Sequence, residues 1–95
     1  MGKLIIFAKY VLFVFSSDIN ESRRHIHVRD RSSKLNNLCK FWIEPKIEIA
    51  QTLGFNKTEL NEIRKLIIIH KELINSQLDK FYAGKKIKSI DLQES

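Results

Sequence analysis

The longest patterned stretch of the sequence, and the one that decides the fold, is residues 54–84, which read GFNKTELNEIRKLIIIHKELINSQLDKFYAG. Apolar residues recur in it every three or four positions, the period of an amphipathic helix. The residues of this stripe are Leu60, Ile63, Ile67, Ile74, Leu78 and Phe81. Asn56 and Glu59 have the spacing of a capping box, and Gly84 is the residue type that ends a helix. We therefore predict one long helix here, with His70 packed in the core on the same stripe.

The part of the chain before this helix is patterned as strands. Five segments are rich in β-branched and aromatic residues or alternate between apolar and polar residues. They are residues 4–7, 10–15, 24–29, 38–43 and 46–51, with polar loops at 16–22 and 30–37. The last segment is short, and a single helical turn is the alternative there. Strands followed by a helix are typical of an α+β fold. We predict an antiparallel sheet of four to five strands, with one long C-terminal helix packed across one face.

One helix covers only one face of such a sheet. Both alternating sets of residues 10–15 are apolar. One set is Val11, Phe13 and Phe15, and the other is Leu12 and Val14. The uncovered face should therefore be partly apolar, which predicts a homodimer or a small protein partner.

Size and composition bound the class of protein. Ninety-five residues, 43% apolar and 29% charged, are typical of a single globular domain. We place this domain at residues 1–84 and expect residues 85–95 to form a basic, partly flexible tail. The single cysteine, Cys39, leaves no internal disulfide; we expect it to be a small buried hydrophobe in a cytoplasmic protein. The apolar run over residues 4–15 is too short to cross a bilayer, so no membrane is expected.

The net charge of +6 is concentrated in the first half of the chain. Residues 1–42 carry eight lysines and arginines against three acids, whereas residues 43–95 carry nine against eight. A localised basic half predicts an acidic partner, which is either RNA or another polyanion, or an acidic protein surface. A solvated basic edge that only keeps strands apart is the alternative.

Residues 23–30, RRHIHVRD, carry the candidate functional side chains. On a strand, His25 and His27 share one face and Ile26 and Val28 the other. We expect a polar strip on the solvent face of the sheet, with the two histidines as candidate catalytic residues. The arginines in and beside this strip, the candidate binding residues, are Arg23, Arg24, Arg29 and Arg31.

Three chemistries fit the histidine pair. The spacing suits zinc or iron, but a closed metal site needs one or two further ligands. The available acids are Asp18, Asp30, Glu44 and Glu48, and nothing in the sequence shows that any of them converges on the histidines. We therefore assign no metal and no cofactor.

The other two chemistries use the arginines. As in small basic ribonucleases, arginines would hold a phosphate while His25 or His27 moves a proton. Against this, no acid at a fixed offset orients either imidazole. The third possibility is binding without chemistry, in which the strip holds phosphates or an acidic partner peptide.

The order of these motifs resembles a known family. The segments FVFSSDINESRRHIHV, CKFWIEPKIEIAQTLGFNKTELNEIRKLI and DKFYAG resemble a small bacterial family, domain of unknown function 4160, over residues 8–84. Members usually carry Pro-Pro before the His-x-His, where Arg23 and Arg24 stand here, so this loop is more basic. The resemblance brings no activity with it.

Members of that family often lie beside a small partner protein from another domain-of-unknown-function family, which has suggested a toxin–antitoxin pair. The resemblance thus implies a small partner-binding protein, one component of a toxin–antitoxin-like pair that uses the basic His-x-His strand. A metal- or phosphate-using ribonuclease-like toxin and a non-catalytic structural or binding module are the alternatives.

Overall fold

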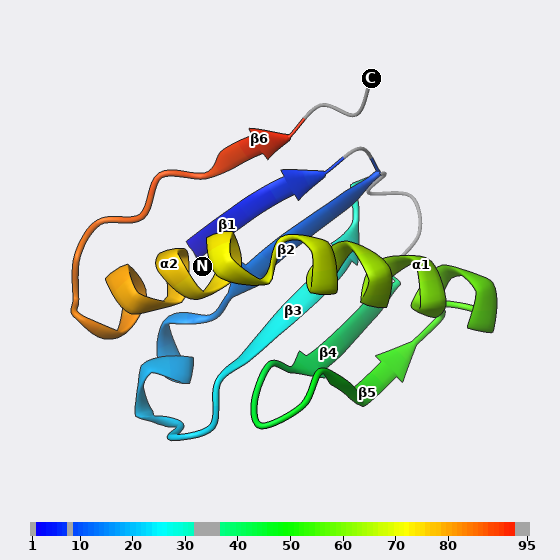
Figure 1. The fold of residues 1–95 in the computed structure, drawn as a ribbon, viewed down its shortest axis with the longest axis horizontal. Coiled ribbons are helices and arrows are strands. Elements are labelled where there is room, and N and C mark those ends of the chain that lie inside the picture. Colours follow the sequence, from blue (N-terminus) through cyan, green and yellow to red (C-terminus); the bar gives the residue numbers. More distant parts are fainter. Residues whose placement is uncertain (1, 8, 32–36, 93–95) are drawn as a thin grey trace.

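The computed structural model describes residues 2–7, 9–31 and 37–92 (Figure 1). In chain order the elements of these ranges are β1 (Gly2–Phe7), β2 (Tyr10–Val14), the 3-10 helix η1 (Ser16–Asn20), β3 (His25–Asp30), β4 (Leu38–Trp42), β5 (Glu48–Leu53), α1 (Lys57–Ile69), α2 (Lys71–Tyr82) and β6 (Ile90–Leu92). The strands form one sheet in the order β5-β4-β3-β2-β1-β6, and α1 and α2 lie across one face of it. The predicted α+β class is confirmed. The predicted loop at 30–37 lies partly outside the described residues.

The sheet has six strands in the described residues, so the prediction of four to five was wrong. The first five strands pair antiparallel with their neighbours, as predicted. The sixth, β6, pairs parallel with β1, with Ile5 opposite Ile90. It lies in the segment that we expected to be a tail. A strand of three residues carries too little pattern to be recognised in the sequence. The amide of the buried Gln77 side chain donates to Leu4 O (2.9 Å) and to Lys88 O (2.8 Å), and these two hydrogen bonds help to hold the segment against the sheet.

The predicted single helix was also wrong, because the described chain forms two helices that meet at His70. Its predicted start is correct: Asn56 Oδ1 accepts from Glu59 N–H (2.8 Å), and Asn56 N–H donates to Glu59 Oε1 (3.1 Å). At His70 the backbone leaves helical geometry (φ −104°, ψ 22°), directly after three consecutive isoleucines whose β-branched side chains weaken helix propensity. Neither helix is both long and apolar enough to cross a membrane.

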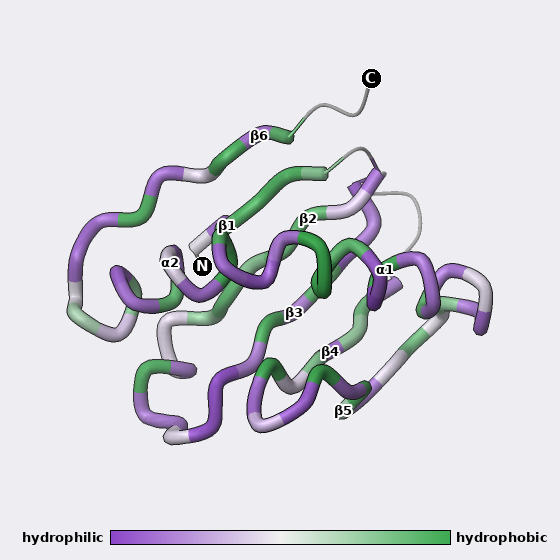
Figure 2. Tube along the Cα trace, viewed as in Figure 1, coloured by the Kyte–Doolittle hydropathy of each residue, from purple (hydrophilic) through white to green (hydrophobic). Residues whose placement is uncertain are grey.

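The core lies between the two helices and the sheet. The apolar stripe continues across the bend at His70, with Ile63, Ile67, Ile74 and Leu78 buried, and Leu60 and Phe81 partly buried. From the sheet, Leu12, Ile26, Val28 and Phe41 are among the side chains that pack against them. Hydrophobic residues accordingly follow β1 and β2 beneath the helices (Figure 2).

The other face of the sheet, here called the helix-free face, is also partly apolar. Since Ile26 and Val28 of β3 belong to the core, the alternating residues His25 and His27 point to the helix-free face. Phe13 lies opposite His27 on β2 and is buried, although it lies outside the core cluster. The second face is therefore partly apolar, as expected, but Phe13 itself is covered.

Candidate functional site

The 3-10 helix η1 brings an acid to the helix-free face. After β2 ends, η1 turns the chain back, and the Asp18 carboxylate accepts the Phe15 backbone N–H at its Oδ2 atom (2.8 Å). The Asp18 backbone carbonyl then accepts the Glu21 N–H (3.0 Å), which closes the turn. These two local bonds fix Asp18 in place, and only 9% of its side chain is exposed.

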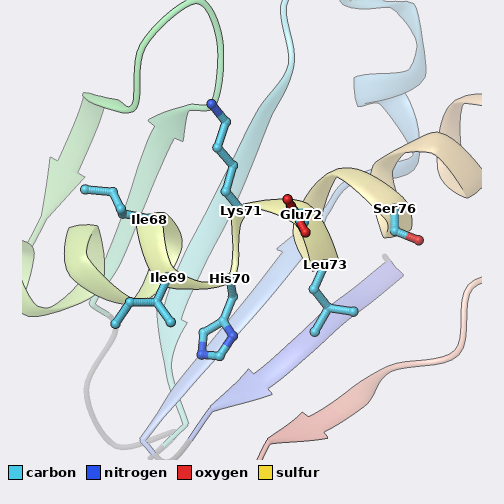
Figure 3. A pocket seen from close by; sticks show the side chains of 7 residues that line it. All are labelled: Ile68, Ile69, His70, Lys71, Glu72, Leu73 and Ser76. Carbon is cyan, nitrogen blue, oxygen red and sulfur yellow. The ribbon is translucent and has the colours of Figure 1, made fainter.

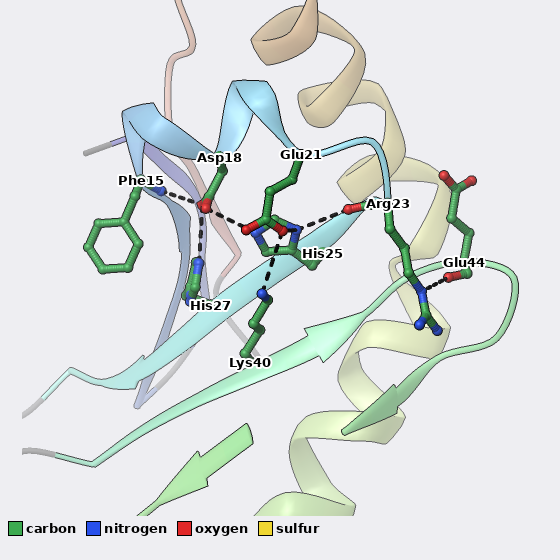
Figure 4. A network of polar contacts seen from close by, with 8 residues as sticks. All are labelled: Phe15, Asp18, Glu21, Arg23, His25, His27, Lys40 and Glu44. Atoms are coloured by element: carbon green, nitrogen blue, oxygen red, sulfur yellow. Dashed lines mark hydrogen bonds and ion pairs between the residues drawn. The ribbon is translucent and has the colours of Figure 1, made fainter. Parts of the chain in front are cut away.

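A single carboxylate contacts both histidines of β3 (Figure 4). Asp18 Oδ1 lies 3.1 Å from His25 Nε2, and Asp18 Oδ2 lies 3.1 Å from His27 Nε2. The contact with His27 is a hydrogen bond, whereas the contact with His25 Nε2 lacks the alignment of one. On its other side, His25 Nδ1 lies 3.0 Å from the Arg23 carbonyl oxygen.

This arrangement corrects two expectations. The histidines do not form an exposed strip: the His25 side chain is fully buried and the His27 side chain is 12% exposed, because η1 covers them. An acid does orient the imidazoles, and it is Asp18. Within the described ranges, Asp18, His25 and His27 are also the only group of three or more potential metal ligands that converge, with ligand atoms within 4.8 Å of one another.

Aromatic rings surround the cluster. Phe13 and Phe15 lie against the His27 ring, with centroids 5.5 and 4.7 Å from it, and Trp42 meets the His25 ring edge-on at 5.7 Å. These rings shield part of the cluster from water, which strengthens the electrostatic interactions there, although Phe15 itself is 40% exposed.

The surroundings shift two pKa values in the cluster. Burial alone would raise the pKa of the Asp18 carboxyl, but the Phe15 N–H and His25 outweigh it and lower that pKa below its usual value. Burial is the largest influence on the pKa of His27; together with His25 and Lys40 it lowers that pKa by more than the neighbouring Asp18 carboxylate raises it. At neutral pH the cluster therefore contains an ionised Asp18 and an uncharged His27.

Charged side chains lie at the rim of the cluster. Glu21 Oε2 is 3.4 Å from His25 Nδ1 and 3.6 Å from Lys40 Nζ. Lys40 Nζ also lies 4.5 Å from the centre of the Trp42 ring. The sequence analysis did not place Glu21 or Lys40 at the candidate site.

The four candidate arginines do not form one strip. Arg23 stacks over Trp42 at 4.2 Å and donates to Glu48 Oε1 (2.9 Å). Arg24 reaches the opposite side of the sheet, where it donates to Asn75 Oδ1 of α2 (3.0 Å) and pairs with Asp79. The two adjacent arginines are thus held by separate acids on separate faces.

Arg29 and Arg31 lie at the other end of β3. Arg29 is opposite Val11 of β2 and Leu38 of β4, which places its side chain on the helix-free face. Arg31 follows the strand and is exposed, and its backbone N–H donates to Lys9 O (2.6 Å).

Two surface hollows differ in their relation to the cluster. A hollow of about 350 Å³ adjoins it, lined by His27, Leu38, Cys39, Lys40, Gln51, Thr52 and Leu53. A larger one of about 680 Å³ lies where α1 meets α2, lined by Ile68, Ile69, His70, Lys71, Glu72, Leu73 and Ser76 (Figure 3). There His70 contacts Phe7 of the sheet (ring centroids 5.2 Å apart), but it is only half-buried and lies outside the core cluster, so the expectation of a core histidine was wrong.

Asp18 is the site residue that the sequence analysis left unassigned. One signal was present, since an aspartate three residues after a strand end can accept the backbone N–H at that end. That signal predicts the turn but not the contact with the histidines, which depends on how η1 lies over β3.

Comparison with known proteins places the chain. Searches among curated proteins and among solved structures returned no match. A family model described as a domain of unknown function matches residues 10–77, which include η1, both histidines and most of the two helices. The resemblance found in the sequence motifs is therefore confirmed, and the chain belongs to the DUF4160 family.

Proposed function

We propose that this is a small partner-binding protein, one component of a toxin–antitoxin-like pair, and that the partner docks on the helix-free face. The observation that carries the proposal is the composition of that face. Both helices cover the opposite face, and on the helix-free face an exposed leucine, Leu53, lies in one row with the partly exposed Leu38 and Arg29. Apolar surface left uncovered in this way is typical of a protein–protein interface.

Strand pairing orders these side chains in two rows. One row across β2, β3, β4 and β5 is Val11, Arg29, Leu38 and Leu53. The next row is Phe13, His27, Lys40 and Gln51. Leu53 stands on the edge strand with 66% of its surface exposed, beside the 350 Å³ hollow. Val11 and Phe13 are buried, so the accessible members of these rows include the apolar Leu38 and Leu53 and the cationic Arg29. They suit a partner that presents an apolar anchor flanked by an acid.

A protein partner fits this face better than a polyanion does. Arg23 and Arg24, which a phosphate backbone would need, are already engaged by Glu48 and Asp79. A homodimer through the same face, and RNA binding through Arg29 and Lys40, are outcomes that the experiment below distinguishes. The buried thiol of Cys39 suits a reducing compartment, so we include a cytoplasmic location in the proposal.

The ribonuclease-like alternative has less support. An acid or base must come within hydrogen-bonding reach of its substrate, and the His25 side chain is fully buried beneath η1. His27 alone borders the hollow, and its nearest polar contact is Asp18. A pair of histidines that share a proton-transfer step would both need access.

The test uses the protein that the neighbouring gene encodes. Co-expression with the present chain shows whether the two form a complex, and isothermal titration calorimetry of the two purified proteins measures their affinity. Leu53→Glu should weaken binding by roughly 10- to 100-fold, because burying a leucine contributes about 1.5–3 kcal/mol. Ile69→Glu is the matched control: it introduces the same charge at an apolar side chain that is 71% exposed at the end of α1, away from the helix-free face. That variant should bind as the wild type does.

Equal affinity of the Leu53→Glu variant and the wild type would contradict docking on this face. Light scattering of the isolated chain identifies a homodimer, which Leu53→Glu should dissociate. Association with RNA instead of a protein would show a steep dependence on salt that Leu53→Glu does not change.

A further inference from the structure

We propose that Asp18, His25 and His27 form a zinc-binding site, in which the ion joins η1 to β3. The proposal goes beyond partner binding and does not depend on it. It rests on the donor set, on the orientation of His25 and on the groups that hold the three ligands in place.

The donor atoms suit zinc. Two imidazole nitrogens and one carboxylate form a common ligand set for Zn²⁺, and the remaining tetrahedral position is left for a water molecule. Ligands at about 2.0–2.2 Å from a tetrahedral ion lie roughly 3.3–3.6 Å apart. Asp18 Oδ1 lies 3.1 Å from His25 Nε2 and Asp18 Oδ2 lies 3.1 Å from His27 Nε2, and one ligand atom from each residue lies within 4.8 Å of the others. Small side chain rotations therefore bring the three donors to bonding distance.

His25 presents a lone pair to the site. Its Nδ1 faces two acceptors, the Arg23 carbonyl oxygen at 3.0 Å and Glu21 Oε2 at 3.4 Å. A ring nitrogen between acceptors carries a proton, so Nδ1–H is the donor and, in the neutral ring, Nε2 carries the lone pair. The Nε2 lone pair then faces Asp18 Oδ1, a third acceptor, at 3.1 Å and has no hydrogen-bond partner in the described chain.

Two acceptors that face each other in a buried site are unfavourable unless a cation lies between them. His25 is fully buried and the Asp18 side chain is 9% exposed, so solvent does not relieve the contact. A proton on Nε2 is the competing explanation, and it is the one under which His25 lowers the pKa of Asp18; the poor alignment of this nitrogen with the carboxylate makes that contact a weak hydrogen bond. A metal ion bound to the Nε2 lone pair and to the carboxylate removes the conflict.

The groups around the ligands are those that a zinc site requires. Histidine ligands of metals almost always donate their other ring N–H to a carbonyl or carboxylate, as His25 does to Arg23 O. The Phe15 backbone N–H holds the Asp18 carboxylate by a 2.8 Å hydrogen bond. His27 borders the 350 Å³ hollow, which gives an ion a route from solvent. Of the nearby cations, Lys40 pairs with Glu21 at the rim of the cluster and Arg23 is bonded to Glu48.

The location of the ligands indicates what the ion does. Asp18 belongs to η1, and His25 and His27 belong to β3, so one ion cross-links the two ends of the connection between β2 and β3. Zinc should thus stabilise the folded chain and hold η1 over the helix-free face.

The test is a titration of the untagged, metal-free chain with zinc chloride, followed by calorimetry and by the melting temperature. The wild type should bind one equivalent of zinc and melt at a higher temperature with zinc than without it. Asp18→Asn and His27→Ala should weaken zinc binding by more than about 100-fold, since even outer-shell partners of a metal contribute about 10- to 100-fold. His70→Ala is the matched control, because this third histidine lies at the helix junction against Phe7; it should leave zinc affinity unchanged.

The outcomes separate a metal site from a hydrogen-bonded cluster. Failure of the wild type to bind zinc, or equal binding by Asp18→Asn, overturns the proposal and leaves a protonated His25 as the explanation of the contact. If a variant does not fold, cobalt substitution of the wild type decides. Visible absorption typical of nitrogen-ligated, low-coordinate Co²⁺ supports the site, and its absence overturns it.

Discussion

Among single side chains, Asp18 has the largest effect on the chemistry of this protein, because its one carboxylate contacts two imidazoles in a shell of aromatic rings. A carboxylate in such a shell is costly to bury unless it is hydrogen-bonded, and the Phe15 N–H and His27 supply that compensation. The same contacts orient both rings. The consequence is a fixed arrangement of two nitrogens and two oxygens in which a change to one group alters the others.

The burial of Cys39 predicts that its thiol reacts slowly. Burial raises the pKa of its thiol to about 12, and the residue is 2% exposed. Only roughly one molecule in 10⁴ is a thiolate at pH 8, so the native chain should react with Ellman's reagent far more slowly than the chain in denaturant. Gln51→Cys, made together with Cys39→Ala, places the thiol on the exposed edge strand and should react at the rate of a free thiol. A native reaction of Cys39 as fast as that control would contradict its burial.

The candidate site was predictable from the sequence only in part. Alternation along residues 24–29 correctly places His25 and His27 on one face, and it marks Ile26 and Val28 as core. Whether that face is exposed depends on η1, a turn of five residues whose position over the strand no local pattern encodes. For the same reason, four acids remained equivalent candidates although only Asp18 reaches both rings.

At the level of the elements, the sequence specifies the start of α1 clearly but does not specify the junction between α1 and α2. The start of α1 is specified by a reciprocal pair of hydrogen bonds between Asn56 and Glu59. The junction at His70 contains neither proline nor glycine, the usual causes of a break. The hydrophobic period continues through it, and the pattern alone therefore predicts one helix where the chain forms two.

The capping box at the start of α1 is open to a direct test. Asn56→Ala removes the acceptor for the Glu59 N–H and should lower the free energy of unfolding by about 1 kcal/mol. Asn61→Ala makes the same change at an exposed position inside α1, where alanine is the better helix former, and should be neutral or slightly stabilising. Urea unfolding followed by circular dichroism measures both. Equal midpoints for the two variants would show that the cap contributes nothing to α1.

In the molecule as a whole, the helices leave one face of the sheet uncovered, and this could be predicted from the number of strands and helices in the sequence pattern. A single helical stretch cannot cover both faces of a sheet, and the doubly apolar β2 makes the uncovered face partly hydrophobic. The sequence pattern does not show which strand forms the edge of the sheet beside β1. The β6 strand joins β1 through contacts between residues more than 80 positions apart, such as Ile5 with Ile90.

Gln77 links these distant parts, and its replacement tests how they hold together. Its side chain is 1% exposed, and its amide donates to Leu4 O at the start of the chain and to Lys88 O before β6. Gln77→Met keeps the volume but leaves both carbonyls without this donor, so the free energy of unfolding should fall by roughly 1–3 kcal/mol. The matched variant Gln51→Met changes an exposed side chain of β5 and should stay within about 0.5 kcal/mol of the wild type. Hydrogen exchange adds a readout of location: in Gln77→Met the amides of β6 should lose protection before those of the central strand β3, because only the edge depends on this side chain. Uniform loss of protection across the sheet would mean that Gln77 supports the core in general and does not specifically hold the C-terminal strand.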